Sequence, residues 1–448
     1  MAIETAATLL EREREIAALG EALDAARAGR GGVVLVEAPA GLGKTSLLRA
    51  ATETAEAAGI RCRRARAGEL ERDFAYGCVR QLLEPVAARA PDAERERLFA
   101  GAAAPARALL APAGLPPASA AVDGSLSILH GLYWLLNNLA SDGPVLLVVD
   151  DLHWADAETL RFLAFLAPRL EGLPLAVLAS TRPEEGVTAD LARLAVAPEA
   201  TVLRPQPLSA AATARLCRLR LGDPVAEEFV AACRIATGGN PFYLEALLRE
   251  ATERGIGTDA RAAVRVRGIG PAAVAHAVLL RLSGAPTAAS ALARAVAILG
   301  DGASLAEAAR LAGEDESEAA RAADLMAGLG ILRAEEGLGF VHPIVREAVY
   351  ADIGPRERAE AHARAALSLA AGGASDERVA AQIVAAEPAG DAGRVALLRR
   401  VASDALARGA PAAAVAWLRR ALAEPPPAAA LGEVLLELGS AELRAGAP

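Results

Sequence analysis

The sequence predicts an α/β domain built on a parallel sheet, followed by helical modules. In the first 205 residues, aliphatic runs typical of buried parallel strands alternate with stretches whose apolar residues recur at helical spacing. Beyond that point the chain is rich in Ala, Leu and Arg, which favour helices. With 448 residues the chain is too long for one domain. We place the domain boundaries at 1–205, 206–265, 266–355 and 356–448.

Composition and charge exclude several classes of protein. A chain with 53% hydrophobic and 23% charged residues is typical of a globular protein, and its net charge of −9 disfavours a dominant nucleic-acid-binding surface. The amino terminus lacks the apolar core of a signal peptide, and no apolar run approaches about 18 residues. We therefore expect a cytoplasmic protein with no membrane partner. The four cysteines lie far apart and are expected to be buried, reduced thiols: Cys62, Cys78, Cys217 and Cys233.

Five strands separated by helical stretches are predicted in the first domain, as in a three-layer α/β fold. Two of them, Val33–Val36 and Val145–Val149, are continuous aliphatic runs, which indicates burial on both faces of a sheet. The carboxyl ends of parallel strands gather at one edge of a sheet, where ligands bind. The predicted strands cover 33–37, 60–66, 145–149, 175–180 and 201–204.

A glycine-rich loop follows the first strand. It has the sequence of a phosphate-binding loop in all but the first position, where Ala38 replaces glycine and keeps the turn only if it avoids a positive φ. Apolar residues then recur at helical spacing until Gly59, so the loop amides and the positive end of a helix both face the phosphates. The predicted nucleotide-binding residues of the loop are Ala38, Pro39, Ala40, Gly41, Leu42, Gly43, Lys44, Thr45 and Ser46.

Lys44 is the only lysine among 47 basic residues, and the other 46 are arginine. A guanidinium is a wide planar fork, whereas an ammonium on a flexible stem is a compact charge that fits between β- and γ-phosphates inside a tight loop. A lone lysine here indicates a position where the guanidinium of arginine cannot replace the ammonium group. We expect ATP or ADP as the ligand, with a catalytic role for Lys44 in stabilising phosphate charge.

Two carboxylates end the strand that begins at Val145. Asp150 is expected to hold Mg²⁺ through water, while Thr45 supplies a hydroxyl to the same ion. Asp151 is expected to orient or deprotonate the attacking water. The alternative is that the two acids only cap the segment that follows them.

An arginine ends the next strand. Arg182 follows the run from Leu175 to Thr181 and is a candidate for sensing the γ-phosphate and stabilising charge during its transfer. The alternative is a surface arginine, since arginines are common at strand tips.

Five strings of the chain resemble the ATPase core of the signal-transduction NTPases called STAND, and in particular the large ATP-binding LuxR-type bacterial regulators. They are Leu10–Glu15, the loop ending in Gly43-Lys44-Thr45, Glu69–Phe74, Asp150–Asp156 and Ser180–Pro183. The resemblance implies a P-loop NTPase domain with an all-α lid. It also implies a switch: ADP holds a closed resting state, while ATP and an unknown inducer, a small molecule or a protein, release an open, self-associating state. Arg12, in the first string, is then a nucleotide-binding residue.

The resemblance assigns a nucleotide contact to Pro241. The segment Gly238–Tyr243 matches the family's Gly-x-Pro element, whose proline packs near the adenine. The alternative is an ordinary helix start, because proline at a first helical position needs no ligand.

Three helical segments and two short β segments around a turn at 335–337 predict a winged-helix-like module within 287–350. Its third helix region is acidic and would repel DNA phosphates, so we expect a regulatory role. In the family that it resembles, a histidine of this module reaches the ADP β-phosphate, and His342 is the matching position. A satisfied core histidine is the alternative.

From about Pro355 the sequence predicts tetratricopeptide-like repeats. Leu406–Pro411 recurs in altered form as Leu443–Pro448, an offset of 37 residues. That offset is a lengthened version of the usual period of about 34. Such repeats do not bury their faces singly, so we infer that the chain is the amino-terminal part of a longer protein. By the resemblance, the missing part holds a DNA-binding helix-turn-helix, and DNA is bound only through it.

The sequence leaves several functions open. The first is a regulatory switch that binds ATP or ADP tightly and hydrolyses ATP slowly, because Asp151 is one methylene shorter than the glutamate common at that place in fast AAA-type motors. The second is a constitutively cycling AAA-type motor. The third is a scaffold whose repeats bind partners around a structural nucleotide.

Overall fold

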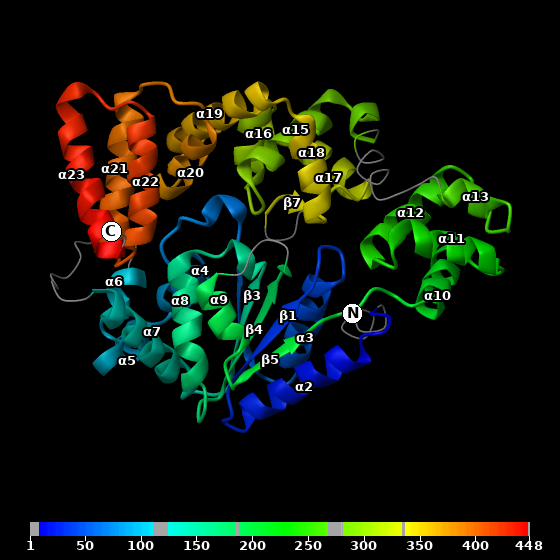
Figure 1. Ribbon diagram of the computed structural model, residues 1–448, viewed down its shortest axis with the longest axis horizontal. Coiled ribbons are helices and arrows are strands. Elements are labelled where there is room, and N and C mark those ends of the chain that lie inside the picture. The colour runs from blue at the N-terminus through cyan, green and yellow to red at the C-terminus, as the bar shows by residue number, and fades with distance from the viewer. Residues whose placement is uncertain are drawn as a thin grey trace. The chain divides into compact units, whose positions relative to one another are not determined.

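The structure is a computed structural model that describes residues 9–110, 124–183, 188–267, 279, 281–333 and 337–446 (Figure 1). The chain forms two compact units, which we describe separately. The loop–lid unit comprises Met1–Ile16, Glu37–Leu47 and Arg204–Ser368. The sheet unit comprises Ala17–Val36, Leu48–Leu203 and Leu369–Pro448.

The sheet unit is built on a five-stranded parallel sheet with the strand order β2-β3-β4-β1-β5. β2 pairs with β3, β3 with β4, and β1 with β5, each in parallel. All five predicted strands are present, each within one residue of the predicted ends. The strands are β1 Gly32–Glu37, β2 Arg61–Arg66, β3 Val145–Asp150, β4 Leu175–Thr181 and β5 Ala200–Leu203.

Burial follows the position of each strand in the sheet. Every residue of β3 and β4 is buried, so both faces of these strands are covered, as a three-layer fold requires. β2 lies at the edge and is only partly buried. Four of its six residues are arginine, a charged composition that discourages pairing with another chain.

Helices before, between and after the strands complete this region. α3 begins at Lys44 and runs to Ala57, and Gly59, with a φ of +77°, ends the segment as predicted. No described helix combines the length and apolar composition needed to span a bilayer. The other helices and 3-10 turns are α2 Glu13–Arg27, η1 Glu69–Glu71, α4 Gly77–Arg89, α5 Asp92–Leu98, η2 Gly101–Ala103, α6 Ala106–Leu110, α7 Gly124–Ala140, η3 Leu152–Trp154, α8 Ala157–Leu166, η4 Ala167–Arg169 and α9 Ala189–Ala195.

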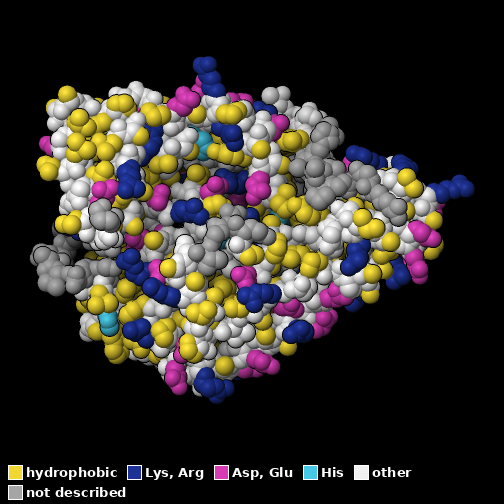
Figure 2. All heavy atoms as spheres, in the orientation of Figure 1, with side chains coloured by type: hydrophobic (Ala, Val, Ile, Leu, Met, Phe, Trp, Pro, Cys, Tyr) yellow, Lys and Arg dark blue, Asp and Glu magenta, His cyan; other side chains and the backbone are white. Residues whose placement is uncertain are grey.

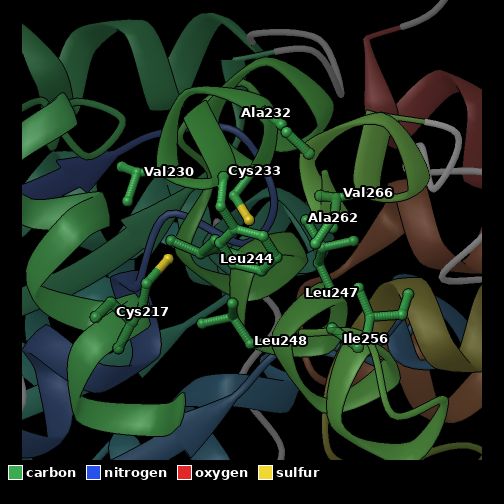
Figure 3. Close-up of a cluster of buried hydrophobic side chains, with 14 of the residues drawn as sticks. Cys217, Val230, Ala232, Cys233, Leu244, Leu247, Leu248, Ile256, Ala262 and Val266 are labelled. Atoms are coloured by element: carbon green, nitrogen blue, oxygen red, sulfur yellow. The ribbon is translucent and has the colours of Figure 1, made fainter. Parts of the chain in front are cut away.

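Four helices of the loop–lid unit enclose one apolar core (Figure 3). They are α10 Ala210–Leu221, α11 Glu227–Thr237, α12 Pro241–Glu253 and α13 Ala262–Arg267. Cys217 and Cys233 lie inside this core and are fully buried. All four cysteines are free thiols, as predicted, although Cys62 is only partly buried.

Three more helices of the loop–lid unit precede a two-stranded antiparallel ladder. α15 Thr287–Leu299, α16 Leu305–Ala312 and α17 Glu316–Gly328 lead to β6 Leu332–Arg333 and β7 Gly339–Phe340, and α18 Pro343–Asp352 follows. Residues 335 and 336 of the predicted turn lie outside the described residues. The winged-helix assignment and the domain boundaries stay predictions.

The carboxyl-terminal region is helical, as predicted. It comprises α19 Pro355–Ala371, α20 Asp376–Ala385, α21 Ala392–Ala407, α22 Pro411–Ala423 and α23 Ala428–Ala445. Within the sheet unit, Glu377 of α20 accepts hydrogen bonds from Arg80 at 2.8 Å and from Arg408 at 2.5 Å. The tetratricopeptide assignment stays a prediction, and residues 447 and 448 of its second repeat lie outside the described residues.

Charged side chains of both signs are scattered over the face drawn in Figure 2. The ion pairs at the surface include Arg64–Glu56 and Arg220–Glu245. Exposed pairs of this kind contribute little to stability, because water and salt screen them.

Candidate functional site

The glycine-rich loop occupies the turn between β1 and α3. Gly41 and Gly43 have φ values of +84° and +87°, which only glycine adopts without strain. Ala38 is not among the residues with a positive φ, so the loop tolerates the loss of its usual first glycine, as predicted. Leu42 is buried and anchors the middle of the loop.

Lys44 is held against the loop backbone. Its Nζ donates hydrogen bonds to the carbonyl oxygens of Ala38 at 2.7 Å and Pro39 at 2.9 Å, and the residue is 6% exposed. An ammonium has three donors, and neutral carbonyls are weaker partners for it than phosphate oxygens. Thr45, the next residue, is exposed, and Ser46 is partly exposed. The donors of this loop therefore fit a polyphosphate.

Arg12 ties the loop to the chain that follows β5. Its guanidinium donates to the carbonyl oxygens of Leu42 at 3.3 Å and Gln206 at 2.8 Å. The residue is 4% exposed, and burial lowers the pKa of its guanidinium while Glu15 and Glu11 raise it. These contacts are all to backbone carbonyls, so Arg12 holds the shape of the loop in this structure.

Pro241 and His342 are brought to the same part of the loop–lid unit. Pro241 is the first residue of α12, and Asn240 is its N-cap. The Nδ1 atom of His342 accepts a hydrogen bond from the Ile344 amide at 3.2 Å, which caps α18. The imidazole of His342 stacks on the ring of Phe242, the residue after Pro241, with centroids 3.7 Å apart. Residues 100 positions apart are thus joined by one aromatic contact.

In the sheet unit, the acid pair at the tip of β3 is held by Ser180 on β4. The Ser180 hydroxyl donates to Oδ1 of Asp150 and accepts a hydrogen bond from the Asp151 amide at 2.9 Å. Asp151 has a φ of +54°, a left-handed conformation that Asp tolerates better than most residues. Both acids are buried, and the Ser180 hydroxyl holds the carboxylate of Asp150 and the backbone of Asp151.

The side chain of Asp151 is paired with Arg66 at the tip of β2. The Nη2 atom of Arg66 lies 3.4 Å from Oδ2 of Asp151, and the two side chains are 31% and 9% exposed. Strand register places Arg66 directly opposite Asp150. Arg182 follows the tip of β4 and is 6% exposed, so it is not the exposed surface arginine of the alternative interpretation.

Two further carboxyls lie buried just beyond the acid pair. Asp156 caps α8 by accepting a hydrogen bond from the Thr159 amide at 2.8 Å, and it also accepts one from the Tyr76 amide at 2.9 Å. Burial raises the pKa of Asp156 to about 6. Burial also raises the pKa of Glu158 to about 7, with a further contribution from the negative charge of Asp156. The hydrogen bonds of Asp156 connect the start of α8 to the Tyr76 backbone.

Sequence reasoning missed three residues of these sites: Arg66, Ser180 and Asn240. Arg66 appears in the sequence only as one of several arginines on an edge strand. Ser180 and Asn240 fall inside the motif strings, but their partners lie 29 or 30 and 200 residues away in the chain. A polar residue at a predicted strand tip or before a helix-starting proline is the signal that could have indicated the last two.

Residues 8–178 match the AAA ATPase domain family. The match includes the loop and the acid pair. These residues therefore match a P-loop ATPase domain of the AAA type. A search of curated proteins finds no match.

One similar solved structure supports the fold. A STAND protein with a tetratricopeptide repeat sensor from Pyrococcus horikoshii is 17% identical with a TM-score of 0.50, and the match covers 95% of this chain and 61% of that one. The chain thus spans less than two thirds of that protein. The Orc1 protein of Aeropyrum pernix in complex with DNA is 17% identical with a TM-score of 0.35, and that match covers 76% of this chain and 92% of the Orc1 chain. A RuvB variant of Thermotoga maritima is 12% identical with a TM-score of 0.33, with shares of 73% and 91%. Only the first reaches a TM-score of 0.5, and at 17% identity it supports the fold alone.

Proposed function

We propose that this chain is the nucleotide-binding part of a signal-transduction switch that binds ATP or ADP and hydrolyses ATP slowly. The observation that carries the proposal is the placement of the only lysine of the chain, Lys44, in a loop whose backbone and side-chain donors suit phosphate oxygens. In binding, Lys44 would exchange the carbonyl oxygens of Ala38 and Pro39 for charged phosphate oxygens, which are stronger partners.

Magnesium belongs to the proposed ligand. No group of three or more acidic, His or Cys side chains among the described residues is arranged to hold a metal ion. Mg²⁺ keeps several waters and binds through few protein ligands plus substrate phosphates, which agrees with a site that needs only the Thr45 hydroxyl and Asp150 from the chain. We assign these two residues to the ion on the family pattern of P-loop ATPases.

Slow hydrolysis is supported by the pairing of Asp151 with Arg66. Asp151, the acid that would orient the attacking water, is paired with the guanidinium of Arg66. Its side chain is also one methylene shorter than that of glutamate. A general base needs its carboxylate within reach of the water, so engagement with Arg66 reduces its effect. This pairing favours a switch over a motor that cycles continuously.

The regulatory role is carried by the motif strings, which resemble LuxR-type transcriptional regulators. In such a protein the nucleotide state would control self-association, an inducer would act on the switch, and DNA would be bound through a domain outside this sequence. The proposed nucleotide-contacting residues also include Arg12, Pro241, His342 and, for the γ-phosphate, Arg182.

Two measurements test this function. The nucleotide that copurifies with the chain is identified by mass after denaturation, and we expect ADP. Steady-state and single-turnover hydrolysis are then compared, and we expect well under one turnover per second without an inducer. Turnover of several per second would support the motor instead. If Lys44→Ala abolished nucleotide binding while partner binding by the helical repeats stayed intact, the scaffold would be favoured.

A further inference from the structure

One carboxamide joins the glycine-rich loop to the lid helix α12. The Nδ2 atom of Asn240 donates a hydrogen bond to the Ala40 carbonyl at 2.9 Å. Its Oδ1 atom accepts hydrogen bonds from the amides of Phe242 at 3.0 Å and Tyr243 at 3.4 Å, which caps α12. The Phe242 amide also lies 3.4 Å from the Gly41 carbonyl, so a backbone contact supports the same connection. We call this set of contacts the Asn240 bridge.

The loop is shaped to receive this side chain. A Cβ added to Gly41 would lie 2.5 Å from Oδ1 and 2.8 Å from Nδ2 of Asn240, which is closer than any real contact. The φ of Gly41, +84°, is a second reason why a side chain is excluded there. Gly41 therefore suits both the turn of the loop and the close approach of the Asn240 amide, which a side chain at this position would displace.

On the lid side of the Asn240 bridge, the backbone turn at Gly239 packs closely against Leu208. Gly239 has a φ of +74°, and a Cβ on it would lie 2.6 Å from the Leu208 carbonyl. Its own carbonyl accepts a hydrogen bond from the Leu208 amide at 2.7 Å. Asn240 thus extends from a backbone turn that cannot shift without losing a close contact, and the position of its amide group is determined by the fold of the lid.

We propose that Asn240 is a positioning residue for nucleotide binding, and that its Nδ2 hydrogen bond keeps the loop in the shape that holds phosphates. This inference rests on the proposed nucleotide-binding function. Along the chain, the Ala40 carbonyl follows the carbonyls of Ala38 and Pro39, which accept hydrogen bonds from Lys44, and it precedes the amides of Gly41 and Gly43. A fixed Ala40 peptide therefore fixes the direction of the loop amides, and less ordering remains to be done when a nucleotide binds.

The chemistry of asparagine allows the two halves of the bridge to be separated. An amide side chain is both donor and acceptor, whereas serine keeps the N-cap acceptor but is too short to reach the Ala40 carbonyl. Asn240→Ser should therefore keep α12 capped and leave the Ala40 carbonyl without its side-chain donor. Unlike aspartate, serine adds no charge that would repel phosphate.

The test compares the affinity of the chain for ADP and for ATP with Mg²⁺ before and after Asn240→Ser. We expect about fivefold weaker binding of both nucleotides, the effect of one lost hydrogen bond, with an unchanged melting temperature of the nucleotide-free protein. Asn138→Ser is the matched control, because Asn138 also donates to a backbone carbonyl, that of Leu98 at 3.0 Å, but on α7 of the sheet unit. The Asn138→Ser variant should bind both nucleotides with the affinity of the wild type.

A second variant tests the loop side. Gly41→Ala places a methyl group where the amide of Asn240 lies, so we expect a larger loss, of about twentyfold or more. The double variant should bind only about as weakly as Gly41→Ala alone, because both changes break the same bridge. Independent, multiplying losses would overturn the inference.

The outcomes separate the two proposals. Wild-type protein that binds no nucleotide contradicts the proposed function. Wild-type protein that binds, together with an Asn240→Ser variant of equal affinity, contradicts only the role of Asn240. A lower melting temperature with unchanged affinity would show that the bridge is structural alone.

Discussion

The loop of the loop–lid unit and the strand tips of the sheet unit hold their charged groups in different ways. Lys44 and Arg12 donate to backbone carbonyls, and Asn240 does the same from the lid. Asp150 and Asp151 instead have side-chain partners, Ser180 and Arg66. The carbonyls that accept from Lys44 and Arg12 are neutral partners that a phosphate can replace, while the acids of the second region are already hydrogen-bonded or ion-paired.

This difference in partners predicts separate roles in nucleotide binding and in ATP hydrolysis. Replacing a carbonyl by a phosphate oxygen strengthens a hydrogen bond, so the loop gains when a nucleotide arrives. Freeing Asp151 from Arg66 breaks an ion pair, so hydrolysis has an added cost that binding does not. We expect changes in the loop to alter affinity and changes at the strand tips to alter turnover.

The largest effect is expected from Asp150→Asn. Loss of the carboxylate that we propose holds the magnesium water shell should lower the hydrolysis rate about a thousandfold. Binding of ADP without Mg²⁺ should stay the same, because the proposed role of the carboxylate is to hold the water shell of the metal ion. Asp142→Asn, which changes an exposed acid paired with Arg97, is the control and should leave turnover unchanged. Equal losses of affinity and turnover in Asp150→Asn would break the comparison.

Glu158 should give the sheet unit a pH-dependent stability. Its pKa is raised by burial from 4.5 to about 7, so between these values the folded state keeps a proton that the unfolded state has lost. Stability therefore falls as pH rises through this window and levels off above it. Relative to the wild type, Glu158→Gln should gain up to about 3 kcal/mol at pH 8 and much less near pH 5.

Urea unfolding of both proteins from pH 5 to 8 measures this gain. Glu56→Gln serves as the control, because Glu56 is an exposed acid, 51% accessible and paired with Arg64. A constant difference between Glu158→Gln and the wild type across that range would show that Glu158 titrates normally in the folded state.

Ser180→Ala tests how the acid pair is aimed. Without the hydroxyl, Oδ1 of Asp150 loses a donor and the Asp151 amide keeps only its hydrogen bond to Oδ1 of Asp150 at 3.1 Å, so the Asp150 carboxylate can turn away from its working direction. We expect kcat for ATP hydrolysis to fall about tenfold with little change in KM. A change in KM alone would place Ser180 with the binding residues.

The smallest effect is expected from Arg66→Gln. Glutamine removes the ion pair and keeps a polar side chain at the edge of the sheet, so Asp151 is released. Turnover should rise about threefold, which corresponds to the free energy of one partly exposed ion pair. A fall in turnover would mean that Arg66 supports the reaction instead of restraining Asp151.

The sheet could be predicted from the sequence because its strands are distinct local signals. Val145–Val149 is an unbroken aliphatic run, and the glycines before Lys44 define a loop that is set by backbone conformation alone. Both features depend on neighbouring residues, so periodicity and turn chemistry are enough to recognise them.

The partners of these residues could not be predicted in the same way. Arg66 and Asp151 are 85 positions apart, and Asn240 and Ala40 are 200 apart. Their contacts depend on which strands become neighbours and on how a lid helix packs, which no local pattern determines. The sequence identified Pro241 in a motif, whereas the side chain that contacts the loop is that of the residue before it.

The most direct test of the central claim is a calorimetric titration of the chain with ADP and with ATP plus Mg²⁺, for the wild type, Lys44→Ala and Lys44→Arg. The account predicts saturable binding to the wild type and about a hundredfold weaker binding to Lys44→Ala. Lys44→Arg should lose at least about tenfold, because a planar fork does not fit the loop. Wild-type affinity in both variants, or a wild type that binds neither nucleotide, would contradict it.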